Sequence, residues 1–346
     1  MRAAVTRGPG EMVVMDVADP GDPGAGEILV RPEAVGICGS DFHYYLGDIG
    51  GVAHSERFPR IQGHEFCAVV EAVGPEGPPE LGSGTRVALW PVHACGNCYP
   101  CRIGRGNACV NIRLIGIHFD GALQERLTLP ATQAFPVGDL APSIAALIEP
   151  VSIAVHTVVR GRVAEGERVV VFGAGPIGQA VALAAVDHGA RVLLVDRVAS
   201  RLEHGKAIGA ETLVASDDAD GFAKARDWAG GDGPEVVIEA TGVPGLLKGS
   251  VELVAQAGRV VVVGLSSDDA PIRVGALPFK ELDLLGVSCC AAEDFAAAVD
   301  LVTRRADVAS TLVTHEFDLE QAPDAIDYAI GHPAEVMKAV VRIGAR

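Results

Sequence analysis

The sequence has 346 residues, with 28 Lys and Arg against 45 Asp and Glu, which gives a formal net charge of −17. This length predicts two domains, and an apolar fraction of 49% supplies enough hydrophobic side chains to exclude wholesale disorder. The acidic balance argues against a nucleic-acid partner and against attachment to anionic lipid. No uninterrupted apolar run reaches the roughly 18 residues of a membrane span, and the N-terminus lacks the apolar region of a signal peptide. We therefore expect a cytoplasmic protein.

The first part of the chain, residues 1–153, is rich in Gly and Pro and contains short runs typical of β-strands. These runs lie at residues 27–37, 66–74 and 86–92. Short strands at such spacing predict an all-β, barrel-like domain.

The middle part, residues 154–291, alternates apolar strand-like runs with helix-like segments. The strand-like runs lie at residues 168–172, 191–195, 235–239 and 259–263. This alternation predicts an α/β domain with a doubly wound parallel sheet.

The last part, residues 292–346, begins with a helical pattern around 295–305 and ends in a strand-like run at 338–343. The pattern alone leaves two arrangements open. The α/β domain could be inserted between two parts of the first domain, or it could be followed by a C-terminal extension.

A glycine motif, Gly173-x-Gly175-x-x-Gly178, lies between the first predicted strand of the α/β domain and the helix after it. In this context the first glycine permits a tight turn, the second lets a pyrophosphate approach the backbone, and the third allows close packing of helix on strand. The phosphates would lie at the helix N-terminus, where free N–H groups favour anions. The motif therefore predicts a dinucleotide site.

The residue that follows the second strand indicates which dinucleotide is bound. Asp196 lies eighteen residues after Gly178. A carboxylate there accepts hydrogen bonds from ribose hydroxyls and repels a 2′-phosphate, which favours NAD over NADP. Arg197 and Arg201 leave NADP open, because a nearby guanidinium can tolerate the phosphate.

Four of the eight cysteines fall within fifteen residues, in a lobe at about 93–112. Clustered cysteines in a cytosolic protein indicate metal binding rather than disulfides. Four thiolates fit a closed tetrahedral zinc site with a structural role, and an iron–sulfur cluster is the alternative. The four ligands would be Cys95, Cys98, Cys101 and Cys109.

Three further short segments carry side chains that bind metals: residues 36–44 with Cys38, residues 63–66 with His64 and Glu65, and residues 147–150 with Glu149. Taken singly, each has a simple structural explanation: a buried thiol, a core histidine and an acid at a helix end.

Taken together with the glycine motif and the four-cysteine lobe, these segments resemble the zinc-dependent medium-chain dehydrogenase/reductase superfamily over essentially the whole chain. The resemblance rests on CGSDFHYY, GHE, the lobe, EP at 149–150, GAGPIG, EATG at 239–242 and VVVGL at 261–265. It implies a GroES-like catalytic domain, a Rossmann domain, and a C-terminal segment that returns to the catalytic domain. CGSDFHYY followed by GHE is most similar to the polyol (sorbitol-type) dehydrogenases.

The resemblance also implies roles for residues near the catalytic zinc. Cys38 and His64 would bind this zinc, and either Glu65 or Glu149 would complete the ligand set. Ser40 and His43 would pass the substrate proton to solvent. Substrate-side positions implied by the resemblance are Tyr44, Glu149, Cys289 and Cys290. Cofactor positions, from the motif or the resemblance, are Gly173, Gly175, Pro176, Ile177, Gly178, Asp196, Arg197, Arg201, Thr241, Val263, Gly264, Leu265 and Ser288.

The chain departs from sorbitol-type enzymes at Cys289 and Cys290, where those enzymes carry an Arg-Tyr pair that holds polyol hydroxyls. Two thiols are weak hydrogen-bond partners, and buried packing is the favoured interpretation of this pair. We expect NAD-dependent oxidation of a hydroxylated secondary alcohol (a polyol, sugar alcohol, cyclitol or diol) to the ketone. Alternatives are an amino alcohol such as threonine, a zinc-dependent reductase or lyase-like enzyme, and an inactive NAD(H)-binding scaffold. We expect a homodimer or homotetramer with two zinc ions per chain.

Overall fold

The structure is a computed structural model that describes residues 1–47 and 58–344. The chain divides into two units: a discontinuous unit, Met1–Glu149 with Ala291–Arg346, and an inserted unit, Pro150–Cys290. The sequence-based boundaries lie after residues 153 and 291. The C-terminal segment thus belongs to the same unit as the N-terminal half, and this answers the question that the sequence pattern left open.

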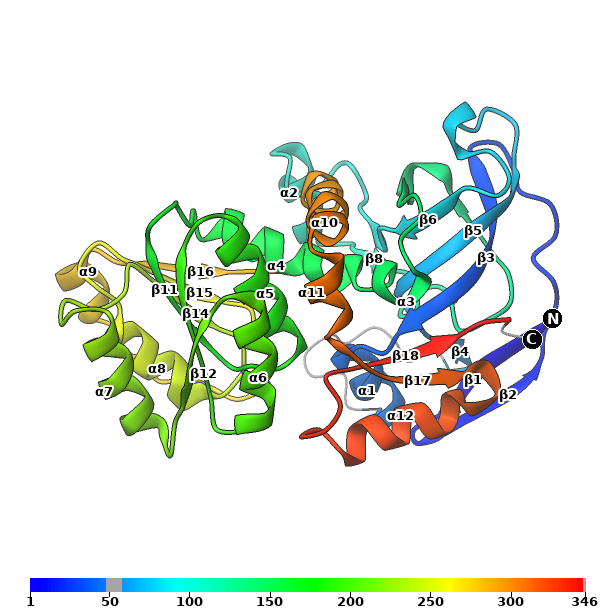
Figure 1. The fold of residues 1–346 in the computed structure, drawn as a ribbon. Coiled ribbons are helices and arrows are strands. Elements are labelled where there is room, and N and C mark those ends of the chain that lie inside the picture. Colours follow the sequence, from blue (N-terminus) through cyan, green and yellow to red (C-terminus); the bar gives the residue numbers. More distant parts are fainter. Residues whose placement is uncertain (48–57, 345–346) are drawn as a thin grey trace. The chain divides into compact units, whose positions relative to one another are not determined.

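The main sheet of the discontinuous unit is built around β3 (Glu27–Gly36). This strand pairs antiparallel with β5 (Glu65–Val73) on one side and with β18 (Lys338–Arg342) on the other. Figure 1 shows the C-terminal β18, in red, beside the blue β3. The other strands of this sheet are β6 (Arg86–Leu89), β9 (Leu127–Pro130), β10 (Ala134–Pro136) and β17 (Val313–Asp318).

Smaller strand pairs and short helices complete the discontinuous unit. A three-stranded sheet contains β2 (Glu11–Asp16), β1 (Arg2–Gly8) and β4 (Arg60–Ile61), and β7 (Val92–His93) pairs with β8 (Arg113–Leu114). The helices are α1 (Gly39–Leu46), α2 (Tyr99–Arg102), α3 (Pro142–Ala145), α10 (Ala292–Arg304), α11 (Ala306–Ser310) and α12 (Ala322–Gly331). Single 3₁₀ turns are η1 (Pro79–Leu81), η2 (Gly106–Ala108), η3 (Ala131–Gln133) and η4 (Leu319–Gln321).

The core of the discontinuous unit joins residues from both ends of the sequence. Ile28 and Val35 of β3 pack in the same buried cluster as Val341 of β18 and Ile326 of α12. This burial of apolar surface drives the C-terminal segment onto the N-terminal sheet. The fold of this unit therefore requires the chain to return after the inserted unit.

The inserted unit has the predicted parallel sheet, with strand order β13-β12-β11-β14-β15-β16. Counted within the unit, this is the order 3-2-1-4-5-6 of doubly wound dinucleotide-binding folds, which confirms the α/β expectation. Its strands are β11 (Arg168–Phe172), β12 (Arg191–Asp196), β13 (Glu211–Val214), β14 (Val236–Glu239), β15 (Arg259–Val262) and β16 (Asp283–Gly286). Its helices are α4 (Ile148–Arg160, beginning at the boundary), α5 (Pro176–Asp187), α6 (Ala199–Ile208), α7 (Asp218–Trp228), α8 (Pro244–Leu253) and α9 (Ala276–Lys280).

One helical stretch, Pro142–Arg160, has the length and apolar composition of a membrane span. In the protein, 67% of its most apolar window is buried. Burial of this kind is what a core helix of a globular protein has, and the stretch is weak evidence for a membrane span.

The turn between β11 and α5 shows why the glycine motif is needed for folding. Gly173 has φ +100°, in the left-handed region that favours glycine. A Cβ on Gly178 would lie 1.7 Å from the carbonyl oxygen of Gly173, whereas a Cβ on Gly175 would have no atom within 4 Å. Close packing of helix on strand therefore depends on Gly178, and Gly175 leaves open space.

We predict that Gly178→Ala destabilises the protein more than Gly175→Ala. The first methyl group meets backbone, so the helix must shift, at a cost of about 1–3 kcal/mol or more. The second enters open space at the N-cap and costs less than about 1 kcal/mol. Urea denaturation followed by circular dichroism measures both variants. Equal destabilisation would contradict the packing role of Gly178.

Candidate active site and metal centres

The pairing of β3 with β5 brings three side chains that bind metals to one place. Gly36, the last residue of β3, lies opposite Glu65, the first residue of β5. Cys38 follows two residues later, at the N-cap of α1, and His64 immediately precedes β5. Donor atoms of Cys38, His64 and Glu65 all lie within 4.8 Å of one another. Thiolate, imidazole and carboxylate are donor types that zinc takes in proteins, so the residues fit this metal.

A buried polar network lies behind His64. Asp41 Oδ1 is 3.8 Å from His64 Nδ1, and Asp41 Oδ2 accepts a hydrogen bond from the Cys38 N–H at 2.9 Å. Gln62 Nε2 donates to Asp41 Oδ1 at 3.2 Å, and Thr6 Oγ1 donates to Gln62 Oε1 at 2.6 Å. A carboxylate behind a metal-binding histidine fixes the orientation of its ring. Asp41 thus accepts a hydrogen bond from the N-cap backbone of α1 and also lies beside His64.

The site concentrates negative charge in a buried place. Burial opposes the charged imidazolium, but the charges of Asp41, Cys38 and Glu149 outweigh it and hold the pKa of His64 well above its usual value. Burial raises the pKa of Glu149 to about 7, to which the charge of Glu65 adds. Both shifts have the direction expected where carboxylates and a thiol gather in a buried place, and a divalent cation bound there would oppose both of them.

The two candidate carboxylates lie differently. Glu65 is 1% exposed and belongs to the group of donor atoms within 4.8 Å, together with Cys38 and His64. Glu149, in the first turn of α4, is also buried but is not a member of that group. Glu65 also forms an ion pair with Lys338 of β18, which sequence reasoning missed. A lysine at the head of an otherwise apolar, strand-like run was the only signal for it.

Helix α1 carries the remaining residues expected near the catalytic zinc. Ser40 Oγ lies 3.3 Å from His64 Nε2, so its hydroxyl is next to the metal group. His43 is exposed on the same helix. Tyr44 is buried, with its ring edge-on to Phe58 and its hydroxyl beside the Arg60 guanidinium, and burial raises its pKa.

The four cysteines of the lobe gather as predicted by their spacing. Their sulfur atoms all lie within 4.8 Å of one another, with Cys98 Sγ 3.3 Å from Cys101 Sγ and 3.7 Å from Cys109 Sγ. Four sulfurs at zinc–sulfur distances of about 2.3 Å would be roughly 3.8 Å apart, so the lobe fits a tetrahedral zinc. Backbone N–H groups around Cys95 lower the pKa of its thiol to about 6, which favours the thiolate. The β7–β8 pair closes the base of the lobe.

The dinucleotide motif is organised by Asp196. Its Oδ2 accepts a hydrogen bond from the Ala174 N–H at 2.7 Å, and its Oδ1 accepts one from the Val198 N–H at 2.8 Å. The carboxylate therefore reaches the glycine turn at the start of α5. Arg201 Nη1 lies 4.0 Å from Asp196, whereas Arg197 is exposed. Pro176 and Ile177 begin α5.

A second pair of loops is joined by Glu239, which sequence reasoning did not assign a role. This buried carboxylate accepts a hydrogen bond from the Thr241 N–H at 2.7 Å, and the Glu239 carbonyl accepts bonds from Val263 and Gly264 at 3.0 Å. Thr241 and the 263–265 segment, both expected to contact the cofactor, are thus brought together. Leu265 is 80% exposed.

Residues 288–290 differ in how far their side chains are exposed. Ser288 is exposed, and Cys289 is half-buried with φ +47°. Cys290 is fully buried, with its sulfur 3.0 Å from the Ser152 hydroxyl. The environment of Cys290 agrees with the interpretation of buried packing.

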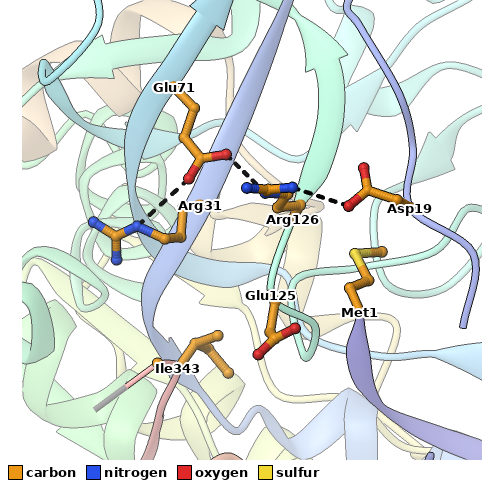
Figure 2. Close-up of a pocket in the computed structure, with 8 residues that line it drawn as sticks. Met1, Asp19, Arg31, Glu71, Glu125, Arg126 and Ile343 are labelled. Atoms are coloured by element: carbon orange, nitrogen blue, oxygen red, sulfur yellow. Dashed lines mark hydrogen bonds and ion pairs between the residues drawn. The ribbon is translucent and has the colours of Figure 1, made fainter. Parts of the chain in front are cut away.

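A pocket elsewhere in the discontinuous unit is lined by charged side chains (Figure 2). Arg126 contacts Asp19 at 3.0 Å and Glu71 at 2.9 Å, and Arg31 lies 3.8 Å from Glu71. The pocket shares no residue with the three-residue metal group. Because both arginines of the pocket are already paired with its acidic side chains, we place the chemistry at the metal group instead.

Comparison with known proteins identifies the family. Residues 24–139 match the family model of the alcohol dehydrogenase GroES-like domain, and residues 176–304 match that of zinc-binding dehydrogenase. The chain is 34% identical to L-galactonate-5-dehydrogenase of Escherichia coli, with 92% of each chain covered. It is 31% identical to sorbitol dehydrogenase of Bacillus subtilis, with 99% of this chain and 97% of the relative covered.

A solved structure agrees with these relatives. An alcohol dehydrogenase from Escherichia coli CFT073, solved with NADH, is 32% identical, with a TM-score of 0.88 and 99% of each chain covered. The chain is thus an NAD(P)-dependent alcohol dehydrogenase that uses zinc. It belongs to the zinc-dependent medium-chain dehydrogenase/reductase superfamily, in which it resembles the polyol dehydrogenases.

Proposed function

We propose that this protein oxidises a secondary hydroxyl group of a polyhydroxylated, sugar-derived substrate to the ketone, with NAD as hydride acceptor. The observation that carries the proposal is the gathering of Cys38, His64 and Glu65 donor atoms within 4.8 Å. The same chain contains a dinucleotide-binding sheet with an acid at the end of its second strand. Relatives that act on L-galactonate and on sorbitol support a sugar-derived alcohol.

The catalytic metal would be held by Cys38, His64 and Glu65, with Glu149 as the alternative carboxylate. A bound zinc supplies Lewis acidity, which lowers the pKa of a substrate hydroxyl. Ser40, 3.3 Å from His64, would accept the hydroxyl proton, and the exposed His43 on the same helix would release it to solvent. Tyr44, Glu149 and Cys289 are candidates for contact with the substrate, whereas the burial of Cys290 favours a packing role.

The cofactor would be held by the turn at 173–178 and by the loops that Glu239 joins. The open space at Gly175 fits the approach of a pyrophosphate, whose charge the N-terminus of α5 favours. Asp196 would accept hydrogen bonds from the adenosine ribose, which favours NAD over NADP. Arg197, Arg201 and Ser288 are further candidate contacts.

A second zinc would bind Cys95, Cys98, Cys101 and Cys109 with no ligand position left for substrate, so its role is to stabilise the lobe. This gives two zinc ions per chain. We place the protein in the cytoplasm, where reduced thiols are maintained. An amino alcohol substrate is the alternative that the experiment below distinguishes.

We propose a homodimer formed through the inserted unit. Strand β16 is the last strand of its sheet, and an unpaired edge invites pairing with another copy. Large apolar side chains lie exposed on and near this edge, with Phe279 88% exposed and Leu284 39% exposed. A homotetramer, as a dimer of such dimers, is the alternative.

The first experiment measures NADH formation at 340 nm with a panel of polyols, sugar acids, cyclitols, diols and threonine. We predict turnover with at least one sugar-derived alcohol, and a loss of about 10³-fold or more in Cys38→Ser, equivalent to about 4 kcal/mol of transition-state stabilisation. Zinc content should fall from two to one per chain.

The matched control is Cys67→Ala, which removes a buried thiol two residues beyond Glu65 that belongs to neither metal group. It should keep both zinc ions and the activity. Activity with threonine alone would favour the amino alcohol alternative. No turnover with any substrate, or full turnover in Cys38→Ser, would contradict the proposed function.

The dimer proposal predicts that Leu284→Arg lowers the mass measured by light scattering, because a buried guanidinium without a partner weakens an apolar interface. Val110→Arg is the control, since Val110 is an exposed apolar residue of the cysteine lobe. A wild-type monomer at micromolar concentration would overturn this assembly.

A further inference from the structure

Lys338, the first residue of β18, is a buried lysine that the functions proposed so far do not use. Its side chain is 4% exposed. Its Nζ donates to Glu65 Oε1 at 2.8 Å, to Glu65 Oε2 at 2.6 Å and to the Ile37 carbonyl at 3.2 Å. The three hydrogens of the ammonium group are thus directed to two places: the carboxylate of one candidate zinc ligand and the backbone next to another, Cys38.

The surrounding backbone fixes this arrangement. Val340 of β18 lies opposite Gly36 of β3, and the Ile37 N–H donates to the Ala339 carbonyl at 2.9 Å, so the register continues to place Lys338 opposite Cys38. A Cβ on Gly36 would lie 2.4 Å from Glu65 Oε2, so the carboxylate occupies the space that a side chain there would fill. Glu65 is therefore confined between strand β3 and the ammonium group.

Ligation of a metal and the ion pair with Lys338 are chemically compatible. An ionised carboxylate has about four lone-pair sites, so each oxygen can accept a bond from the ammonium group and one can still face a cation. The charges favour the combination, because Lys338 interacts with Cys38 and Glu149 as well as with Glu65. Asp41 and His64 are the other ionisable groups beside these carboxylates.

Stabilisation of the fold alone explains this buried lysine less well than a role in positioning Glu65. A buried ion pair contributes little net stability, because desolvation of both charges offsets their attraction. Removal of the lysine alone leaves the Glu65 charge uncompensated in a buried place. The main role of the lysine is therefore to set the position of the Glu65 carboxylate and to compensate its charge.

We propose that Lys338 is a positioning residue for the catalytic metal: it holds the Glu65 carboxylate next to Cys38 and His64 and thereby makes Glu65, rather than Glu149, the carboxylate ligand. The inference rests on the proposed binding of zinc by Cys38, His64 and Glu65. It assigns a function to the C-terminal strand, which lies outside the active-site motifs of the sequence.

The test uses full-length, zinc-loaded protein and measures zinc release to a chromophoric chelator, together with metal content. In Lys338→Met, we expect the zinc outside the cysteine lobe to dissociate about 10–100-fold faster, the usual effect of losing a residue that orients a metal ligand. Lys338→Arg should retain the zinc much better, because it keeps the charge and the donors. Lys280→Met is the matched control, since Lys280 donates to backbone carbonyls in the inserted unit.

The spectrum of the cobalt-substituted protein reports ligand geometry independently of activity. Lys338→Met should change the visible bands of the cobalt outside the lobe, and Lys280→Met should not. Unchanged zinc release and an unchanged cobalt spectrum in Lys338→Met would overturn the inference. A wild-type protein that holds only the lobe zinc would overturn both the proposed function and this inference.

Glu65→Gln and the double variant Lys338→Met/Glu65→Gln cover the case in which Lys338→Met fails to fold, because the double variant leaves no buried charge unpaired. If Lys338 acts through Glu65, the two variants release zinc at the same rate. Much faster release from the double variant than from Glu65→Gln would show that the lysine acts by another route and would overturn the inference.

Discussion

The pairing of β3 with β5 on one side and β18 on the other is the constraint on which the candidate site depends. It sets Gly36 opposite both Glu65 and Val340, so that the end of β3 carries Cys38 between strands from distant parts of the chain. Backbone hydrogen bonds thus set the spacing of the donor groups, and the side chains only supply the chemistry. The pairing with β18 also explains why the chain must return to the first unit after the inserted one, since Lys338 arrives only with that strand.

The second consequence of this pairing is electrostatic. Cys38, Asp41, Glu65 and Glu149 share a buried region in which His64 and Lys338 provide the positive charge among the described residues. Uncompensated anions are costly in such a place, and burial raises the pKa of Glu149 accordingly. A divalent cation bound there would supply positive charge to this region, so binding of the metal would also stabilise the fold. In the cysteine lobe, four gathered thiolates would likewise be stabilised by a bound cation, at a site with no ligand position left for substrate.

Local patterns in the sequence predicted much of this architecture, because their chemistry depends on near neighbours. The four cysteines and the glycine turn lie within short segments, and the alternation of strands and helices predicted the parallel sheet. The resemblance to a family indicated that Cys38 and His64 are metal ligands, which the sequence around each residue does not indicate by itself. Lys338, Gln62 and Thr6 could not be found in this way, because their contacts arise from the register of strands far apart in sequence. Glu239 lay within a quoted motif, but its role depends on its backbone carbonyl, which accepts hydrogen bonds from a separate loop at Val263 and Gly264.

The most direct test of this account is anomalous diffraction at the zinc edge from crystals of the full-length protein. The account predicts two peaks per chain, one among the four lobe cysteines and one bonded to Cys38, His64 and Glu65, with Lys338 still paired to Glu65. A chain with a single peak in the lobe, or a second metal bound by Glu149 with Glu65 turned away, would contradict it.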